Sequence, residues 1–279
     1  MLKVSTKILT GCGALLAAGL TQATLVAGQL PPAGRSVFSG DVDIKWVPVA
    51  STEELHAAEG TSVLHLLTDY EAFVVRLLLT KAHLRAGIEA YESGNVGNAL
   101  AHLGQPVDVL HEDLDRWLRT PGAEPFEAVL DELVAAVRAK ASIDVVNQEL
   151  GTALSAIDGA LEKLDVDLRE APGFIMLVTV AVVGAAADEY ALAISDGHIV
   201  DMIEYQDARA FILEARAYAK AASAGLMAKN AGAYGILMAE FAALDMALPP
   251  EAGFLGTPTK LAELRRAVAR IALLYSSFK

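Results

Sequence analysis

Residues 171–187, APGFIMLVTVAVVGAAA, form an uncharged stretch that decides the fold. A helix that spans a membrane needs about 20 apolar residues, and this stretch is shorter. Arg169-Glu170 precedes it and Asp188-Glu189 follows it, so it has no basic anchor of the kind that flanks spanning helices. A helix that is apolar on all sides lies in a protein core. The stretch therefore predicts the central, buried helix of a bundle and not a single-pass membrane anchor.

The composition and the spacing of apolar residues around this stretch also favour helices. Hydrophobic residues make up 54% of the 279 residues and aromatic residues only 6%. Three- and four-residue spacing of apolar side chains predicts an all-α helical bundle, made of two packed antiparallel sub-bundles at 61–168 and 169–279. The expected helices are 62–91, 96–103, 107–120, 126–140, 143–164, 173–194, 202–227, 231–246 and a last one that starts at Thr257-Pro258.

The N-terminus has the features of an export signal. Lys3 and Lys7 precede an apolar run at 8–20, and small residues follow at Ala23 and Gly28, either of which suits cleavage. We therefore predict a signal peptide at 1–28, a linker at 29–60 that holds one short strand near 42–46, and a periplasmic mature protein. The alternative is a lipoprotein.

The sequence Leu9-Thr10-Gly11-Cys12 spells a lipobox, which is the basis of that alternative. Lys7 lies too close to Cys12 to leave an apolar core before the cut, so the signal peptide is favoured. Cleavage also removes Cys12, the single cysteine of the chain. Thiol catalysis, iron–sulfur clusters and thiolate metal sites are then excluded for the mature protein.

The charge and the missing motifs limit the possible functions further. The formal net charge of −13 argues against nucleic acid as a partner and makes cations the natural complement. The chain contains no Gly-x-Ser-x-Gly elbow, no Gly-x4-Gly-Lys loop and no His-Glu-x-x-His pair. We therefore predict a protein that is not an enzyme.

The segment 80–117 holds three histidines, His83, His102 and His111. A turn is predicted at 92–95, and His83 and His102 are nearly equidistant from Ser93. In an antiparallel hairpin these two histidines would face each other across helices roughly 8–10 Å apart, within reach of one metal ion.

The alternatives differ between the histidines. His83 lies roughly 120° from the centre of the apolar stripe of its helix, on a flank of small residues, so it is either at a second interface or on the surface. His111 falls on an apolar stripe and is expected to be buried, either as a ligand or as a hydrogen-bonded core histidine.

Two glutamates in the second half of the chain complete the candidate metal ligands. Glu204 lies about 40° from the centre of the apolar stripe of its helix, and Glu189 lies at the edge of its own buried face. Buried carboxylates need partners, and carboxylates with imidazoles are what a metal site in a bundle requires. The alternative is that Glu204 pairs with Arg209 or Arg216, or caps a helix end.

The segment 188–209, DEYALAISDGHIVDMIEYQDAR, resembles the extracytoplasmic helical domain of bacterial high-affinity iron permeases. The resemblance rests on the following positions: Glu189-Tyr190, Gly197, Ile199, Glu204-Tyr205, Gln206-Asp207-Ala208-Arg209 and Phe211. The turn His102-Leu103-Gly104-Gln105-Pro106 is similar to that of helical periplasmic proteins found with iron-uptake systems. The Arg-Glu-x-x-Glu motif of the permeases and the Gly-x-His-x-x-Glu motif of imelysin-type proteins are absent.

Together the residues and the resemblance predict a periplasmic metal-binding accessory protein of iron uptake or homeostasis. The metal would be iron, with zinc or another divalent metal as the alternative, and His83, His102, His111, Glu189 and Glu204 are the candidate ligands. A membrane iron transporter is the expected protein partner. Two other functions stay open: a structural or interaction bundle without a metal, and a carrier of an apolar ligand near 174–183.

Overall fold

The computed structural model describes residues 67, 69–104, 126–250 and 257–279, all of which belong to one compact unit, Val49–Lys279. The described part is almost entirely helical, which confirms the predicted all-α bundle. The predicted signal peptide, linker and short strand, the helix at 107–120 and His111 lie outside the described residues. The division into two sub-bundles at residue 169 stays a prediction.

The described helices follow the predicted order. They are α2 (Asp69–Glu92), a helical segment at 96–104, α4 (Phe126–Arg138), α5 (Ile143–Glu162), α6 (Val166–Arg169), α7 (Pro172–Ala193), α8 (Met202–Ala221), α9 (Ser223–Ala247), α10 (Leu261–Leu273) and a 3-10 turn, Leu274–Ser277.

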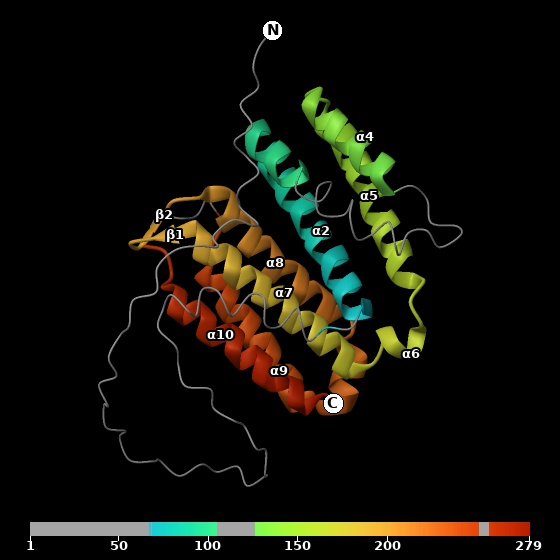
Figure 1. Ribbon diagram of the computed structural model, residues 1–279, viewed down its shortest axis with the longest axis vertical. Helices are drawn as coiled ribbons and strands as arrows, with labels where there is room; N and C mark the ends of the chain where they lie inside the picture. Colours follow the sequence, from blue (N-terminus) through green and yellow to red (C-terminus); the bar gives the residue numbers. More distant parts are fainter. Residues whose placement is uncertain (1–66, 68, 105–125, 251–256) are drawn as a thin grey trace, which may run out of the picture. The chain divides into compact units, whose positions relative to one another are not determined.

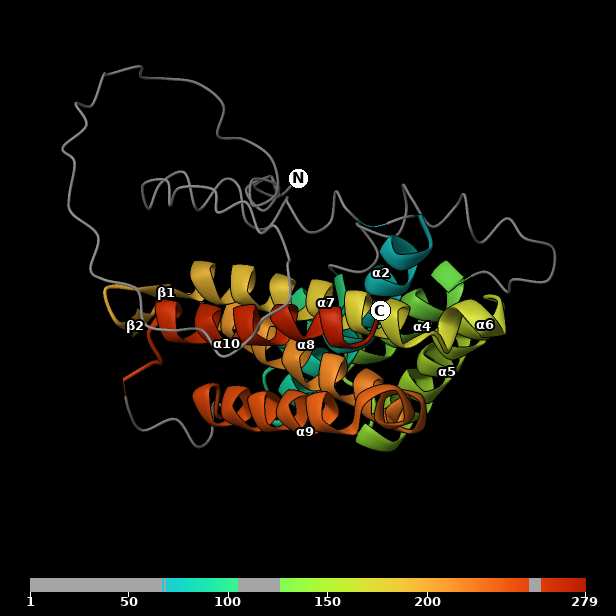
Figure 2. The same ribbon diagram turned by 90° about the horizontal axis from the view of Figure 1, so that it is seen from below.

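Helices α7, α8, α9 and α10 form a closed four-helix arrangement. Contacts join α7 to α8, α8 to α9, α9 to α10 and α10 back to α7. Figure 1 and Figure 2 show these four helices lying side by side, with α7 and α8 on the side that faces α2. The short connections from α7 to α8 and from α8 to α9 favour antiparallel neighbours, as in other helical bundles.

Helix α2 packs on α7 and α8, and the hairpin of α4 and α5 packs on α2 through α5 (Figure 1). Helix α2 therefore joins the hairpin of α4 and α5 to the arrangement of α7 to α10. An ion pair between Lys81 Nζ and Asp158 Oδ1, 2.8 Å apart, links α2 to α5. Helix α2 thus lies between α5 on one side and the pair of α7 and α8 on the other.

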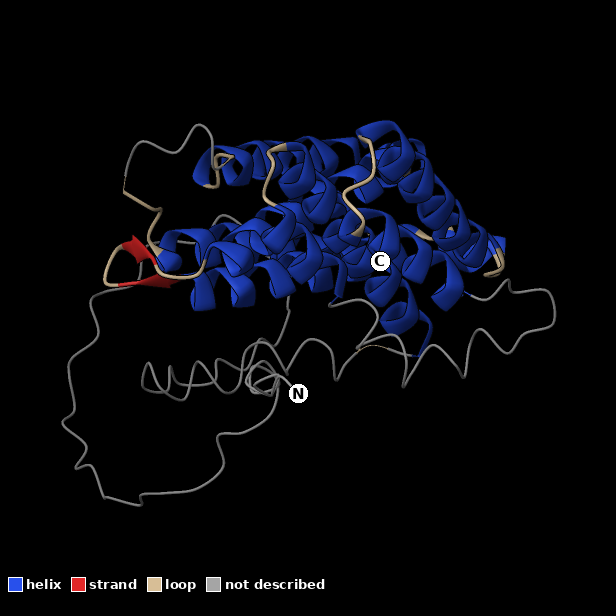
Figure 3. Cartoon of the chain, turned by 90° about the horizontal axis from the view of Figure 1, so that it is seen from above, coloured by secondary structure: helices blue, strands red, loops and turns tan. Residues whose placement is uncertain are grey.

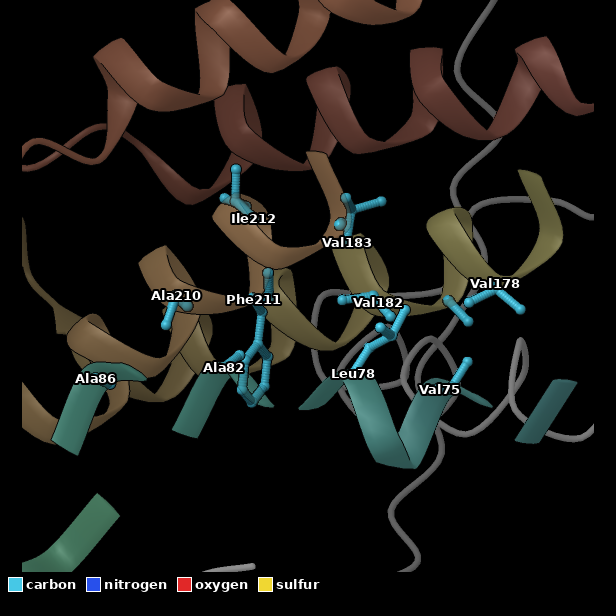
Figure 4. Packing of buried hydrophobic residues seen from close by; sticks show 14 of the residues in the cluster. Val75, Leu78, Ala82, Ala86, Val178, Val182, Val183, Ala210, Phe211 and Ile212 are labelled. Atoms are coloured by element: carbon cyan, nitrogen blue, oxygen red, sulfur yellow. The ribbon is translucent and has the colours of Figure 1, made fainter. Parts of the chain in front are cut away.

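Helix α7 has the burial expected of a central helix. Its side chains from Phe174 to Val183 are buried apart from Leu177, which is half-buried. Figure 4 shows Val178 and Val182 of α7 close to Val75 and Leu78 of α2. By length and composition α7 is the one described helix that could cross a membrane, and most of its residues are buried against other helices.

A tight hairpin connects α7 to α8. Strands β1 (Ile194–Ser195) and β2 (His198–Ile199) pair antiparallel, and Figure 3 shows them at one end of the helices. Asp196 and Gly197 adopt positive φ of 50° and 74°, as a two-residue hairpin turn requires. Because the connection is short, the last turns of α7 lie beside the first turns of α8.

The helix boundaries at two places differ from the prediction. The expected helix 202–227 breaks at Ala222, and α9 begins at Ser223 with a non-helical residue at Asn230. Asn230 Oδ1 accepts a hydrogen bond from Ala233 N at 3.0 Å, so its side chain caps the helix that follows the kink. The predicted boundary between residues 227 and 231 agrees with the kink at Asn230. The break at Ala222 was missed, because apolar spacing continues through it.

The last helix also starts later than predicted. Thr257-Pro258 was expected to begin it, but the N-cap of α10 is Lys260. Thr259 Oγ1 donates to the carbonyl of Ala247, and the carbonyl of Thr259 accepts from Tyr190 Oη. These bonds to α9 and α7 hold Thr259 outside the helix, so that α10 begins only after Lys260.

Gly87 allows the segment 96–104 to lie close to α2. A Cβ atom added at Gly87 would lie 2.8 Å from Leu103 Cγ and 3.2 Å from the carbonyl oxygen of Ala99. Leu103 is fully buried and is the neighbour of His102 in the sequence. The missing side chain at Gly87 therefore helps to bring His102 to the bundle.

We expect Gly87→Ala to lower the free energy of unfolding by about 1–2 kcal/mol, because overpacking at Leu103 costs more than the helix gains from alanine. Gly151→Ala is the matched control, since among the described residues a Cβ at that position would meet no atom within 4 Å apart from its chain neighbours and its own helix backbone. It should stabilise the protein by about 0.5–1 kcal/mol. Denaturant unfolding measures both, and equal effects of the two substitutions would contradict the packing account.

Candidate metal centre

Asp207, on α8, is the centre of a cluster of polar side chains inside the bundle. Its side chain is fully buried. Its Oδ1 atom lies 2.8 Å from Nδ1 of His83 and 2.9 Å from Nδ1 of His102. One carboxylate oxygen of α8 thus accepts hydrogen bonds from histidines of α2 and of the segment 96–104.

His102 is the more deeply buried of the two histidines, with no exposed side-chain surface. Its second ring nitrogen, Nε2, lies 2.9 Å from Oε1 of Gln206. Both nitrogens of this imidazole are therefore engaged by neighbouring residues of α8. A buried histidine of this kind has a single orientation.

His83 lies at the edge of the same cluster. Its side chain is 13% exposed, and its ring meets Phe211 edge-on with the centroids 4.9 Å apart. Figure 4 shows the ring of Phe211 reaching from α8 to Ala82 on α2. The flank of small residues on α2 is thus a second buried interface, which resolves the two alternatives for His83 in favour of partial burial.

The pKa values show which groups of the cluster carry charge. Burial alone would raise the pKa of Asp207, but hydrogen bonds from His102 and His83 outweigh it and the pKa is lowered. Burial alone would lower the pKa of His102, but the hydrogen bond to Asp207, the charge of Asp207 and the bond to Gln206 raise it. In the metal-free protein Asp207 is therefore an anion beside a readily protonated His102.

The donor atoms of this cluster fit a metal ion. One ring nitrogen of each histidine and one carboxylate oxygen of Asp207 all lie within 4.8 Å of one another. Ligands of one ion lie within roughly 4.4 Å of each other, twice a typical bond length, so small side-chain movements would suffice. Among the described residues, Oδ2 of Asp207 has no hydrogen-bond partner, which leaves a buried, uncompensated acceptor in this part of the core.

Glu189 of α7 and Glu204 of α8 form a second acidic group beside this cluster. Burial raises the pKa of Glu189 to about 9, and a hydrogen bond with Glu204 and the charges of Glu204 and Asp207 add to the shift. Glu189 is thus protonated at neutral pH and can donate to Glu204. The charge of Glu204 also contributes to the raised pKa of His102.

The structure brings four of the five predicted ligands to one region, but they form two separate groups there. His83 and His102 come together, as the hairpin predicted, and both contact Asp207, which was not among the predicted ligands. Among the described residues, the three-residue group with metal-ligand spacing contains neither Glu189 nor Glu204, which pair with each other beside it. His111 lies outside the described residues, so its predicted role stays a prediction.

The structure also bears on the alternative partners of Glu204. Arg209 lies 3.1 Å from Glu89, and Arg216 pairs with Asp245. The capping role at the start of α8 belongs to Asp201, whose Oδ1 accepts from Ile203 N at 2.9 Å. Glu204 instead has Glu189 as its hydrogen-bond partner.

Asp207 is the residue that the sequence analysis missed as a ligand. It lies within the quoted segment 188–209, one turn after Glu204 on the same side of α8. Asp207 also precedes the buried Ala208. The spacing Glu204-x-x-Asp207 on a helix with an apolar face was the available signal.

The tyrosines of the same segment have structural partners. Tyr190 and Tyr205 are fully buried, and their hydroxyl groups donate to the carbonyls of Thr259 and Pro249. Their ring centroids lie 6.1 Å apart. The two Glu-Tyr pairs therefore place glutamates at the acidic group and tyrosines against the connection from α9 to α10.

Comparison with known families gives one match. Residues 167–272 match the model of the iron permease-associated four-helix bundle domain. This confirms the resemblance that the segment 188–209 indicated, and the matched range contains the closed arrangement of α7 to α10. Neither the curated proteins nor the solved structures gave a match.

The match covers one side of the cluster. Glu189, Glu204, Gln206 and Asp207 lie within the matched residues, whereas His83 and His102 precede them. The histidines are therefore supplied by α2 and the segment 96–104, which lie outside the matched residues. The cluster combines acids of the matched domain with imidazoles from outside it.

Proposed function

We propose that this protein is a periplasmic metal-binding accessory protein of an iron transporter, and that it is not an enzyme. The observation that carries the proposal is the set of the partly buried His83 and the fully buried His102 and Asp207, in which one carboxylate oxygen has no hydrogen-bond partner among the described residues. A buried acceptor of this kind costs free energy unless a cation or donor satisfies it. The match to an iron permease-associated domain supports iron as the cation.

His83 Nδ1, His102 Nδ1 and Asp207 would hold the ion. Imidazole and carboxylate ligands suit Fe(II), Mn(II) and Zn(II), and the described residues contain no thiol that would favour Cu(I). Glu204 and Glu189 would supply further oxygen ligands or hydrogen bonds when Glu189 loses its proton. The iron is cargo in this proposal, delivered to or received from a membrane transporter.

Titration calorimetry of metal-free protein with Fe(II) under anaerobic conditions, and with Zn(II), tests the proposal. We expect micromolar or tighter binding, and at least a roughly 100-fold loss of affinity in His83→Ala and His102→Ala. His198→Ala is the matched control, because His198 is exposed in the hairpin. Millimolar binding, or equal loss in all three variants, would reject a metal site at this cluster.

A further inference from the structure

Gln206 and Asp207 hold the two nitrogens of one imidazole. Asp207 Oδ1 lies 2.9 Å from Nδ1 of His102, and Gln206 Oε1 lies 2.9 Å from Nε2 of the same ring. The two residues are neighbours on α8. Side chains of neighbouring helical residues diverge by about 100°, which allows them to contact the ring from two directions.

A third residue contacts the same oxygen of the Gln206 amide. Asn98 Nδ2 donates to Gln206 Oε1 at 3.4 Å, from the same helical segment as His102 and one turn before it. The oxygen of the amide, rather than its NH2 group, is thereby directed to the imidazole. An amide oxygen only accepts hydrogen bonds, so Nε2 of His102 must carry a hydrogen.

The hydrogen on Nε2 determines which nitrogen is free to bind a metal. A histidine binds a metal through a nitrogen without a hydrogen, and the other ring nitrogen usually donates to a protein acceptor. With Nε2–H directed to Gln206, the proton that must leave His102 is the one on Nδ1. Nδ1 of His102 is also the nitrogen that lies beside Asp207 Oδ1, the atom that Nδ1 of His83 contacts at 2.8 Å.

We propose that Gln206 is a positioning residue that makes Nδ1 of His102 the metal-binding nitrogen. The inference rests on the proposed metal-binding function and adds the residue that sets ligand identity and ring orientation. Gln206 itself does not bind the ion. Loss of such an outer hydrogen-bond partner lowers metal affinity by about 10–100-fold in other metal sites.

Three variants test this role, with Zn²⁺ alone as the probe. Gln206→Leu removes the acceptor, and we expect Zn²⁺ affinity to fall by about 10–100-fold. Gln206→Glu keeps an acceptor at the same distance and should recover affinity to within a few-fold of the parent protein. Gln148→Leu makes the same chemical change on the exposed surface of α5 and should leave affinity unchanged. Circular dichroism confirms that each variant is folded.

NMR of the parent protein with ¹⁵N-labelled histidine gives a readout that a purely structural role would not change. In the Zn²⁺-bound protein, Nε2 of His102 should keep its hydrogen while Nδ1 shows the shift of a metal-bound nitrogen. Zn²⁺ on Nε2, or Gln206→Leu binding as tightly as the parent protein, would overturn the role of Gln206 alone. A parent protein that binds no Zn²⁺ and no Fe(II) would overturn the metal site itself.

Discussion

Asp207→Asn is expected to lower the free energy of unfolding of the metal-free protein by about 3–5 kcal/mol, because removal of one partner from a buried charge pair leaves the other uncompensated. Asp207 is fully buried and accepts from two histidines through one oxygen. The asparagine amide has the same shape but cannot balance a protonated His102. Denaturant unfolding at neutral pH measures the loss.

The same substitution should remove metal binding. Asp207 provides the carboxylate on which both imidazoles converge. The substitution should therefore lower metal affinity by more than the roughly 10–100-fold that loss of an outer hydrogen-bond partner costs. Calorimetry with Fe(II) or Zn(II) measures the affinity. Asp207→Asn protein that binds either ion as tightly as the parent protein would exclude Asp207 as a ligand.

Asp158→Asn provides the matched control for both measurements. Asp158 pairs with Lys81 at 2.8 Å, but its side chain is 56% exposed. Exposed ion pairs contribute about 0–1 kcal/mol, so this substitution should change stability little and leave metal affinity unchanged. Comparable losses of stability and of metal affinity in Asp158→Asn and Asp207→Asn would contradict the effect attributed to the burial of Asp207.

The sequence was sufficient to predict the parts of this site that depend on short-range patterns. The turn at residues 92–95 is a local feature, with Gly94 at a φ of +84°, and it places His83 opposite His102 by simple counting. The uncharged stretch of α7 predicted burial without knowledge of its partners. These predictions required only the geometry of a helix and of a turn.

The sequence could not predict which acid meets the histidines. Asp207 is separated from His83 by 124 residues, so the contact depends on how α2 packs on α8. Helical periodicity places Glu204 and Asp207 on related sides of α8 but does not say which one lies opposite α2. The packing of α2 against α8 decides this, and no single-sequence pattern reports it.

The metal-free protein is expected to lose stability as the pH rises from about 5 to about 9. Burial raises the pKa of Glu189 from 4.5 to about 9, so between these values the folded state holds a proton that the unfolded state has released. The free energy of unfolding falls with pH wherever the native state binds more protons. The contribution of Glu189 is complete below about 4.5 and is lost as the pH passes about 9.

The other two titrating groups do not reverse this trend. The raised pKa of His102 gives stability that is complete below 6.5 and is lost as the pH rises through the folded value. The lowered pKa of Asp207 gives stability that is present above 3.8 and is lost only as the pH falls below that range. In the window from 5 to 9 both changing contributions therefore have the same sign.

Unfolding of metal-free protein in denaturant at several pH values tests this expectation, with Glu204→Gln as the informative variant. Glutamine removes the neighbouring charge and can donate to Glu189, so the pKa of Glu189 should fall and the slope of stability against pH should become shallower. Glu162→Gln, at an exposed position on α5, should keep the slope of the parent protein. Stability that rises with pH between 5 and 9 in the parent protein would contradict the protonated state of Glu189.

Saturating metal should reverse the slope of stability against pH, because metal binding releases the protons of His102 and Glu189 and is therefore favoured at higher pH.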